Sequence, residues 1–174
     1  MHPVDIENTL KTLTLVVDTR EQDTERARRR ISRTRLPYVR RALSFGDYTC
    51  FVTLPDGAEL DFSDSVAVER KMDLDEIISC FTRHRARFER EFIRAKNANA
   101  KLYLLIENAS WEKVISGKYR SKMFPNALLA SMTAWMARYD TQIVMCDEII
   151  SSVMIREILI REVKERLAEV EYGN

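Results

Sequence analysis

The chain has 174 residues, of which 45% are hydrophobic and 32% charged, and its formal net charge is +1. This composition predicts one globular domain with a substantial core and excludes an intrinsically disordered chain. No apolar run approaches the roughly 20 residues of a membrane span, and the N-terminus lacks the layout of a signal peptide. Three scattered cysteines without a CxxC pair argue against a disulfide framework or a zinc site, so we expect a cytoplasmic protein.

We expect residues 1–11 to be a loose N-terminal leader and residues 12–170 to form the domain. The first predicted strand, 13–17, is apolar and β-branched and runs into the charged segment from Asp18 to Glu21. Functional sites of α/β sheets gather at the carboxyl ends of strands, so these charged residues are candidates. A helix cap is the alternative role for Asp18. The arginine-rich segment that follows, 22–34, predicts a helix.

A Gly-Asp turn opens the next predicted strand, 43–52, and places Asp47 near its start. Pro55-Asp56-Gly57 is a hairpin signal that leads back into another strand, 66–71. An antiparallel pairing of these two strands would bring Asp47 near Glu69. The alternative for Asp47 is the common one of an ordinary turn aspartate.

The strand 66–71 reads Val-Ala-Val-Glu-Arg-Lys and therefore ends in charged residues. Glu69 and Lys71 are two positions apart, so on a strand their side chains share one face. Removing two such charges from water is unfavourable unless something uses them. A carboxylate can hold a divalent ion while an amine lies beside the attacking water or the scissile phosphate. The pair therefore predicts the site of a metal-dependent nuclease.

The remainder of the chain alternates helices and strands. A helix begins at Asp73 or Asp75, and a second one carries Phe88 and Phe92 at helical spacing. A buried strand then ends at Glu107. After it we expect a short helix (111–115), a basic loop (117–122), a helix (125–139), a strand (142–146) and a long helix (147–170). This order predicts a single α/β domain without internal repeats.

Basic residues cluster locally although the whole chain is nearly neutral. Nine arginines and three acidic residues lie between Arg20 and Arg41, and six basic and two acidic residues lie between Arg83 and Lys96. A basic face on a near-neutral protein suits contact with phosphate groups. A solvated helix face is the equally weighted alternative for each cluster alone.

The acidic candidates are Asp18, Glu21, Asp47, Glu69 and Asp75, with the basic residues Arg70 and Lys71 among them. The chain has only two histidines, so a histidine-based triad is not indicated. It also has no GxxxxGK[ST] phosphate loop, which argues against a nucleotide cofactor. Carboxylate oxygens favour Mg²⁺ or Mn²⁺ over zinc. An aspartate at a turn followed by a strand that ends in Glu-x-Lys is the pattern of the PD-(D/E)xK nucleases.

Three segments match a more specific pattern. They are Val17-Asp18-Thr19-Arg20-Glu21, Gly46-Asp47-Tyr48 and Glu69-Arg70-Lys71-Met72-Asp73-Leu74-Asp75. Together they resemble the XPF/Hef family of structure-specific DNA nucleases, whose signature is GD…ERKxxxD. The resemblance covers residues 12–147, and it implies a restriction-endonuclease-like mixed β-sheet flanked by helices. It also implies that two copies of the chain could form a homodimer.

The resemblance implies a role for each candidate residue. Asp47 and Glu69 would be metal ligands, Asp18 would be a further metal ligand or support the metal's water, and Glu21 would have a supporting role. Lys71 would be the catalytic lysine, and Arg70 and Asp75 would complete the catalytic site. The residues expected to face the DNA are Arg20, Arg83 and Arg87.

We therefore expect a Mg²⁺- or Mn²⁺-dependent endonuclease that cuts DNA at branched structures or at junctions of single and double strands. The chain shows neither the helix-hairpin-helix module nor the helicase that accompany this domain in other family members, so its own basic surface or a partner would find the DNA. Two alternatives stay open: a non-catalytic DNA-binding or scaffold protein of the same fold, and a phosphodiesterase that acts on RNA.

Overall fold

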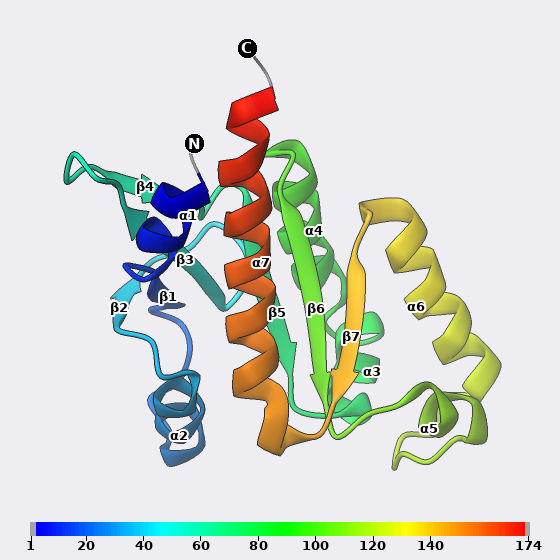
Figure 1. Ribbon diagram of the computed structural model, residues 1–174. Coiled ribbons are helices and arrows are strands. Elements are labelled where there is room, and N and C mark those ends of the chain that lie inside the picture. The colour runs from blue at the N-terminus through cyan, green and yellow to red at the C-terminus, as the bar shows by residue number, and fades with distance from the viewer. Residues whose placement is uncertain (1–2, 173–174) are drawn as a thin grey trace.

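A computed structural model describes residues 3–172, including the side chains of residues 4–169. These residues form one seven-stranded mixed sheet with helices on both faces (Figure 1). The strands are β1 (Thr14–Asp18), β2 (Tyr38–Arg41), β3 (Tyr48–Thr53), β4 (Glu59–Asp61), β5 (Val66–Lys71), β6 (Lys101–Glu107) and β7 (Gln142–Cys146). The helices are α1 (Pro3–Leu10), α2 (Glu25–Thr34), α3 (Leu74–Phe81), α4 (Arg85–Asn97), α5 (Trp111–Ser116), α6 (Pro125–Tyr139), the 3₁₀ turn η1 (Glu148–Ile150) and α7 (Ser151–Tyr172).

The strand order is β2-β1-β3-β5-β6-β7, and β4 pairs with β3. The strands β5, β6 and β7 are parallel, whereas β3 runs antiparallel to β1 and to β5. The predicted antiparallel pairing is thereby confirmed, with Tyr48 opposite Val68. The hairpin turn at Gly57 leads first into the short strand β4, which was not predicted. Residues near the ends of β1 and β5 therefore meet at the turn that precedes β3.

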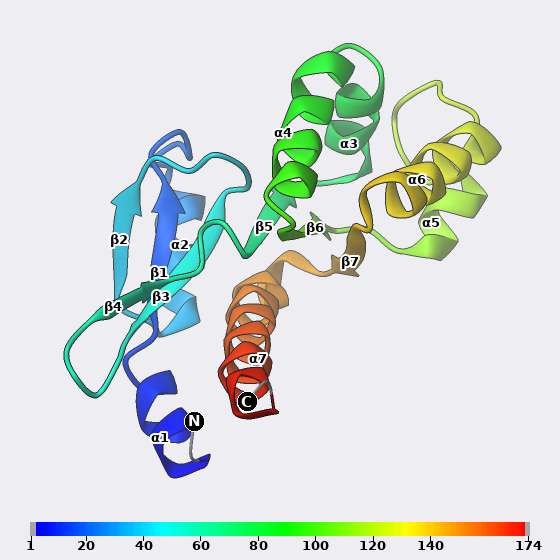
Figure 2. The ribbon, with the colours of Figure 1, turned by 90° about the horizontal axis from the view of Figure 1, so that it is seen from above.

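Two apolar cores lie on the two faces of the sheet (Figure 2). On one face α1, α2 and α7 cover residues of β1, β3, β5 and β6. On the other face α3 to α6 cover alternate residues of β5 and β6, and Trp135 packs among Phe81, Phe88 and Phe92. The apolar stripes of α6 and α7 are thus used in the core. The alternation of side chains along β5 sends neighbouring residues into different layers.

Several predicted boundaries are corrected. The prediction of a loose leader is wrong for residues 3–10, because they form α1 and bury Ile6 against the core that α7 helps to build. Residues 1 and 2 lie outside the described part of the chain. Asp147 caps η1 and α7 itself begins at Ser151; the side chain of Val170 is not described. Asp73, and not Asp75, caps α3, as the Asp73 alternative predicted. None of the helices in the described range is long and apolar enough to cross a membrane.

Candidate active site

The turn before β3 brings Asp47 onto β5. Gly46 has a positive φ of 73°, and a Cβ at this position would lie 2.7 Å from the Cβ of Ala67. Only glycine fits both restraints, so the turn can press against β5. The backbone N–H of Asp47 then donates to the carbonyl of Val68 at 2.9 Å. Its Oδ2 accepts the backbone N–H of Arg70 at 2.8 Å, so the carboxylate is held beside the end of β5.

Glu69 and Lys71 share one face of β5, as their spacing predicts. The Nζ of Lys71 lies 2.5 Å from Oε1 of Glu69, and both side chains are largely buried, at 11% and 7% exposure. Oε2 of Glu69 is buried without a hydrogen-bond partner among the described residues. A buried carboxylate oxygen without a partner is unfavourable in isolation, and it marks the place where a ligand would be bound.

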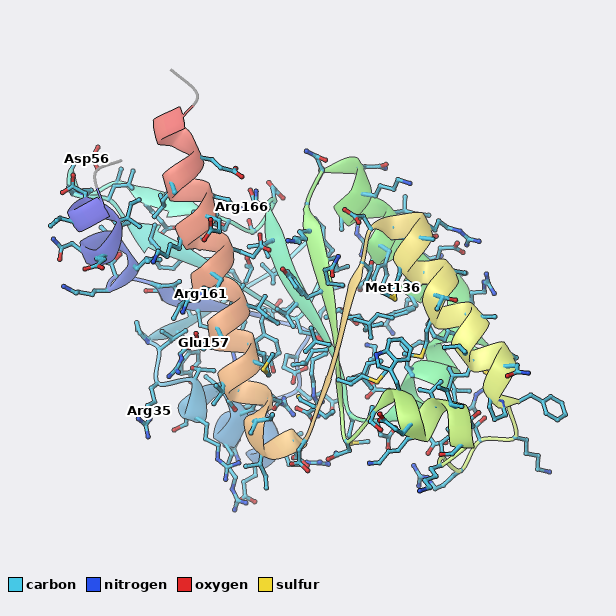
Figure 3. The ribbon with its side chains drawn as sticks, turned by 45° about the vertical axis from the view of Figure 1, so that its right-hand side comes forward. Arg35, Asp56, Met136, Glu157, Arg161 and Arg166 are labelled. Atoms are coloured by element: carbon cyan, nitrogen blue, oxygen red, sulfur yellow. The ribbon has the colours of Figure 1, made fainter. Side chains whose placement is uncertain are left out.

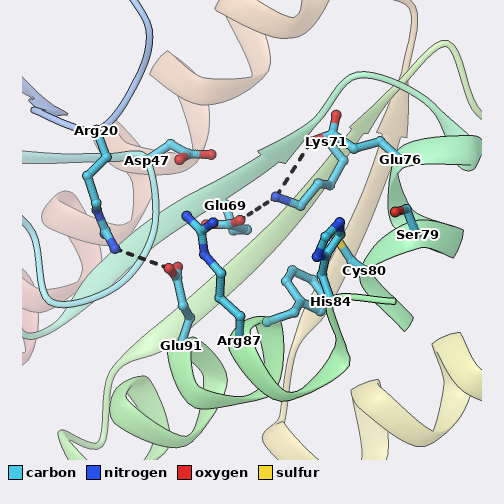
Figure 4. A pocket seen from close by; sticks show the side chains of 11 residues that line it. Arg20, Asp47, Glu69, Lys71, Glu76, Ser79, Cys80, His84, Arg87 and Glu91 are labelled. Carbon is cyan, nitrogen blue, oxygen red and sulfur yellow. Dashed lines mark hydrogen bonds and ion pairs between the residues drawn. The ribbon is translucent and has the colours of Figure 1, made fainter. Parts of the chain in front are cut away.

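Asp47, Glu69 and Lys71 line one pocket of about 410 Å³ between β5, α3 and α4 (Figure 4). The other residues that line it are Arg20, Glu76, Ser79, Cys80, His84, Arg87, Phe88 and Glu91. Arg20 and Arg87 are the arginines at this pocket, and their predicted role in facing DNA stays a prediction. The pocket is therefore wide and polar enough for a phosphodiester group.

At the end of β5 two carboxylates, Asp47 and Glu69, share one ammonium group, that of Lys71. Burial and the nearby charge of Glu69 raise the pKa of Asp47 well above its usual value. Burial also raises the pKa of Glu69, against the opposing influence of Lys71. Burial alone would lower the pKa of Lys71, but Glu69 and Asp47 outweigh it and raise that pKa, so the ammonium stays charged. Without a second cation, the two carboxylates are electrostatically unfavourable together.

This donor set fits a hard divalent cation. Asp47 and Glu69 supply carboxylate oxygens, and the free Oε2 of Glu69 is available as a ligand atom. No group of three or more His, Cys, Asp or Glu residues within the described range is arranged to hold a metal by itself. Mg²⁺ commonly takes one or two protein carboxylates and fills its remaining positions with water and substrate oxygens. The pocket meets that requirement.

Asp18 lies under the pocket and does not line it. Its side chain is 1% exposed and accepts both the backbone N–H of Arg20, at 2.6 Å, and the guanidinium of Arg20, at 2.7 Å. Burial raises the pKa of Asp18, but these bonds from Arg20 outweigh it and hold the pKa below its usual value. The role that the structure supports for Asp18 is to orient Arg20. Its predicted role as a metal ligand stays a prediction.

Arg70 and Glu21 lie on the opposite face of the sheet from the pocket. The guanidinium of Arg70 contacts Glu107, which is fully buried and also accepts from Arg30 at 3.0 Å. Glu21 accepts from Arg30 at 3.2 Å. Because side chains alternate along a strand, Arg70 cannot reach the pocket that its two neighbours line. Only its backbone belongs to the site, through Asp47.

Asp75 and Arg83 line a second, more open hollow of about 850 Å³ beside the loop 117–122. Asp75 accepts the backbone N–H of Ser121 at 2.7 Å and pairs with Arg120 at 3.1 Å. Burial raises the pKa of Asp75, and its bonds with Arg120 lower it further than burial raises it. Asp75 therefore anchors a loop, and the structure does not bring it to the pocket of Glu69.

Glu91 and Glu76 are pocket carboxylates that the sequence does not predict. Glu91 lies on α4, and its Oε1 is 3.3 Å from the guanidinium of Arg20, while its charge also raises the pKa of Glu69. A signal was present, because Glu91 follows Arg87 by four residues and so shares its helix face. In the sequence Glu91 counts only as one of the two acidic residues between Arg83 and Lys96.

A mixed sheet that presents a turn aspartate beside Glu-x-Lys on the next strand has the architecture of the PD-(D/E)xK nucleases. The model of the ERCC4 domain family matches residues 17–155, and the chain belongs to this family, that of the XPF-type nuclease domains. No protein of curated function gave a significant match.

Two solved structures have the same fold. XPF from Aeropyrum pernix is 20% identical, with a TM-score of 0.59 over 84% of this chain and 59% of that chain. XPF from Aeropyrum pernix in complex with DNA is 21% identical, with a TM-score of 0.60 over 88% of this chain and 66% of that chain. This chain thus spans about three-fifths of the first of these relatives.

Proposed function

We propose that this protein is a Mg²⁺- or Mn²⁺-dependent endonuclease that hydrolyses phosphodiester bonds in DNA. The observation that carries the proposal is that Oε2 of Glu69 is buried without a hydrogen-bond partner among residues 4–169, in one pocket with Asp47 and Lys71. A bound divalent ion would lower the pKa of an attacking water and neutralise charge on the reacting phosphate. The family match and the DNA-bound relative of the same fold support nucleic acid as the substrate.

The residues of the pocket have separate tasks in this proposal. Asp47 and Glu69 would hold the ion. Lys71, kept positively charged by its two carboxylate neighbours, would stabilise negative charge that develops on the phosphate oxygens. Arg20, oriented by Asp18, and Arg87 would bind the phosphate backbone and hold it against the metal.

The experiment is a nicking assay on plasmid and on labelled oligonucleotides with each metal. Glu69→Gln and Lys71→Ala should each abolish cutting, and a chelator should stop the wild type while leaving some DNA binding. Wild-type rates in either variant would refute the site. DNA binding without cutting under every metal would favour the non-catalytic alternative, and equal or faster cutting of matched RNA would favour the RNA-directed one.

Branched or junction DNA is the substrate we propose within this class. The second hollow, at Arg83 and the loop 117–122, adjoins the catalytic pocket and shares Ser79 with it, which provides room for a second strand. Competition among flap, fork and plain duplex DNA of equal length tests the preference. A homodimer is a further part of the proposal, and sedimentation of the free and DNA-bound protein tests it.

A further inference from the structure

A separate hollow of about 80 Å³ lies between α2 and the first turn of α7, on the face of the sheet opposite Glu69 and Lys71. Four arginines of α2 line it, and their spacing of three to four residues places them on one helix face. They are Arg26, Arg29, Arg30 and Arg33. Against these four positive charges Glu148 is the one acidic residue among those that line the hollow. The lining is therefore strongly cationic.

Ser152 supplies an independent sign that this hollow takes a ligand. Its side chain lines the hollow and is only 1% exposed, yet its hydroxyl has no hydrogen-bond partner among the described residues. Its neighbour Ser151, in contrast, donates to the carbonyl of Glu148 at 3.0 Å. The Ser152 oxygen is not one of the fully enclosed side-chain atoms without a partner in the described structure, so it is accessible from the hollow and can donate to an acceptor bound there.

The arginines are only partly neutralised. Arg26 pairs with Glu148 and Arg30 pairs with Glu107, but Arg33 has no ion pair among the described residues. Arg29 pairs only with the exposed Glu25, and such pairs contribute little. A water needs about 10–15 Å³ of such volume, so the hollow has room for several waters or for one tetrahedral oxyanion.

The cationic surface continues beyond this hollow. A shallower one of about 360 Å³ shares Arg29 and Arg33 with it and adds Arg28, Ser32 and one acidic residue, Glu25. A ligand with anionic groups at regular intervals would match this surface better than a single small anion. The hollow also lies close to the catalytic strand, because Nη1 of Arg26 is 3.2 Å from the sulfur of Met72, the residue after Lys71.

We propose that the hollow between Arg29 and Arg33 of α2 and Ser152 of α7 binds phosphate groups of a nucleic-acid backbone, as a second contact on the far side of the sheet from the catalytic pocket. The proposal rests on the proposed function for its choice of ligand. Phosphates of the substrate remote from the scissile bond would be held here, and the carboxyl edge of β5 would lie between the two contacts. Arg30, which lines the hollow, donates hydrogen bonds to Glu107 of β6 and to Tyr48 of β3. These bonds attach the hollow to the sheet.

The test uses the full chain and fluorescence anisotropy with a labelled junction DNA at several salt concentrations, without metal. Ser152→Ala removes only a hydroxyl for which the described part of the chain supplies no hydrogen-bond partner, and should weaken binding about 3- to 10-fold with an unchanged melting temperature. Arg33→Glu should weaken binding by about 10-fold or more and lower the salt slope by about one. Cleavage at saturating DNA should keep its wild-type rate in both variants.

The matched control is Arg161→Glu, the same charge change in the middle of α7, away from its first turn (Figure 3). In the described structure Arg161 has only a 3.9 Å contact with Glu157 to lose. If Ser152→Ala binds as the wild type does and Arg33→Glu no worse than Arg161→Glu, the second contact is refuted. Normal metal-dependent cutting by the same variants in the nicking assay would leave the proposed function standing.

A second experiment distinguishes a nucleic-acid backbone from a free phosphate ion as the ligand of this hollow. Inorganic phosphate is titrated into the protein while the backbone amide of Ser152 is followed by NMR. A saturable shift that DNA reverses by competition supports a backbone contact. Saturation by phosphate that DNA does not disturb would assign the hollow to a small free anion and overturn the nucleic-acid part of the proposal. No shift with either ligand would refute the site altogether.

Discussion

The backbone N–H of Arg70 donates to Oδ2 of Asp47 at 2.8 Å, while the guanidinium of the same arginine contacts Glu107 on the other face of the sheet. One residue therefore serves the candidate site with its main chain and the opposite core with its side chain. The position of Asp47 depends on the backbone of β5 and on the turn at Gly46. It does not depend on the side chain at position 70.

Arg70→Met tests this division. It leaves the backbone bond to Asp47 intact but removes one of the two arginines that neutralise Glu107. We expect the free energy of unfolding to fall by about 1–3 kcal/mol, as for the loss of a hydrogen bond to a buried charge. Binding of Mn²⁺, measured by calorimetry, should change less than about 3-fold. Lost metal binding with unchanged stability would instead place the side chain in the site.

Lys71→Ala should separate metal binding from chemistry. The substitution removes the ammonium that lies 2.5 Å from Glu69. Glu69 is then a less neutralised carboxylate, so Mn²⁺ affinity should stay equal or increase. The single-turnover rate of cleavage should fall by about 100-fold or more, because a donor to the transition-state charge is lost. Parallel loss of metal affinity would contradict the assigned role.

Asp47→Asn should stabilise the metal-free protein at neutral pH. Burial and Glu69 raise the pKa of Asp47 in the fold above its usual 3.8. As pH rises above 3.8, the unfolded chain loses this proton before the native protein does, so the carboxyl lowers stability progressively until the native pKa is passed. The melting temperature of the variant should exceed that of the wild type at pH 7, and the two should converge below pH 3.8. Such a trade of stability for function is common at active sites.

Glu107→Gln should be strongly destabilising. It removes the carboxylate that Arg30 and Arg70 share in a fully buried position. Arg70 then loses its ion pair and the buried Arg30 keeps only Glu21, which should cost about 3–5 kcal/mol of unfolding free energy in urea titrations.

The pH dependence of that loss has a defined sign. Burial raises the pKa of Glu107, but Arg70 and Arg30 outweigh it, so the pKa lies below its usual 4.5. The wild-type stabilisation is complete above pH 4.5 and is lost as pH falls through the native pKa. The difference between the two proteins should therefore shrink only on strong acidification; a difference that grew in acid would contradict this account.

Gly46→Ala should displace Asp47 and destabilise the fold. The new methyl group would lie 2.7 Å from the Cβ of Ala67, at a positive φ of 73°. We expect a loss of about 2 kcal/mol or more, of which roughly 1–2 kcal/mol is the left-handed backbone. Ala67→Gly in the same chain removes the clashing atom and should recover the rest, together with metal binding. A double variant no better than the single one would show that packing against β5 is not the cause.

Local sequence patterns predicted much of this site. The period of two along a strand places Glu69 and Lys71 on one face, and the Gly-Asp turn places Asp47 at the start of β3. The same period already required Arg70 to face the other way, although the family resemblance grouped it with the catalytic residues. The leader was mistaken because Ile6 gains its burial from α7, far away in the sequence.

The sequence alone determined the α/β fold class, the family and the central trio of Asp47, Glu69 and Lys71. Tertiary structure alone decided which other charges join them. Asp18 bonds to Arg20, and Asp75 bonds to the loop at Ser121. Glu91, on α4, lines the pocket. The physical reason is that strand and helix periods are local properties of the chain. The partner of a charged side chain depends on which distant elements pack beside it, and on how much water they exclude.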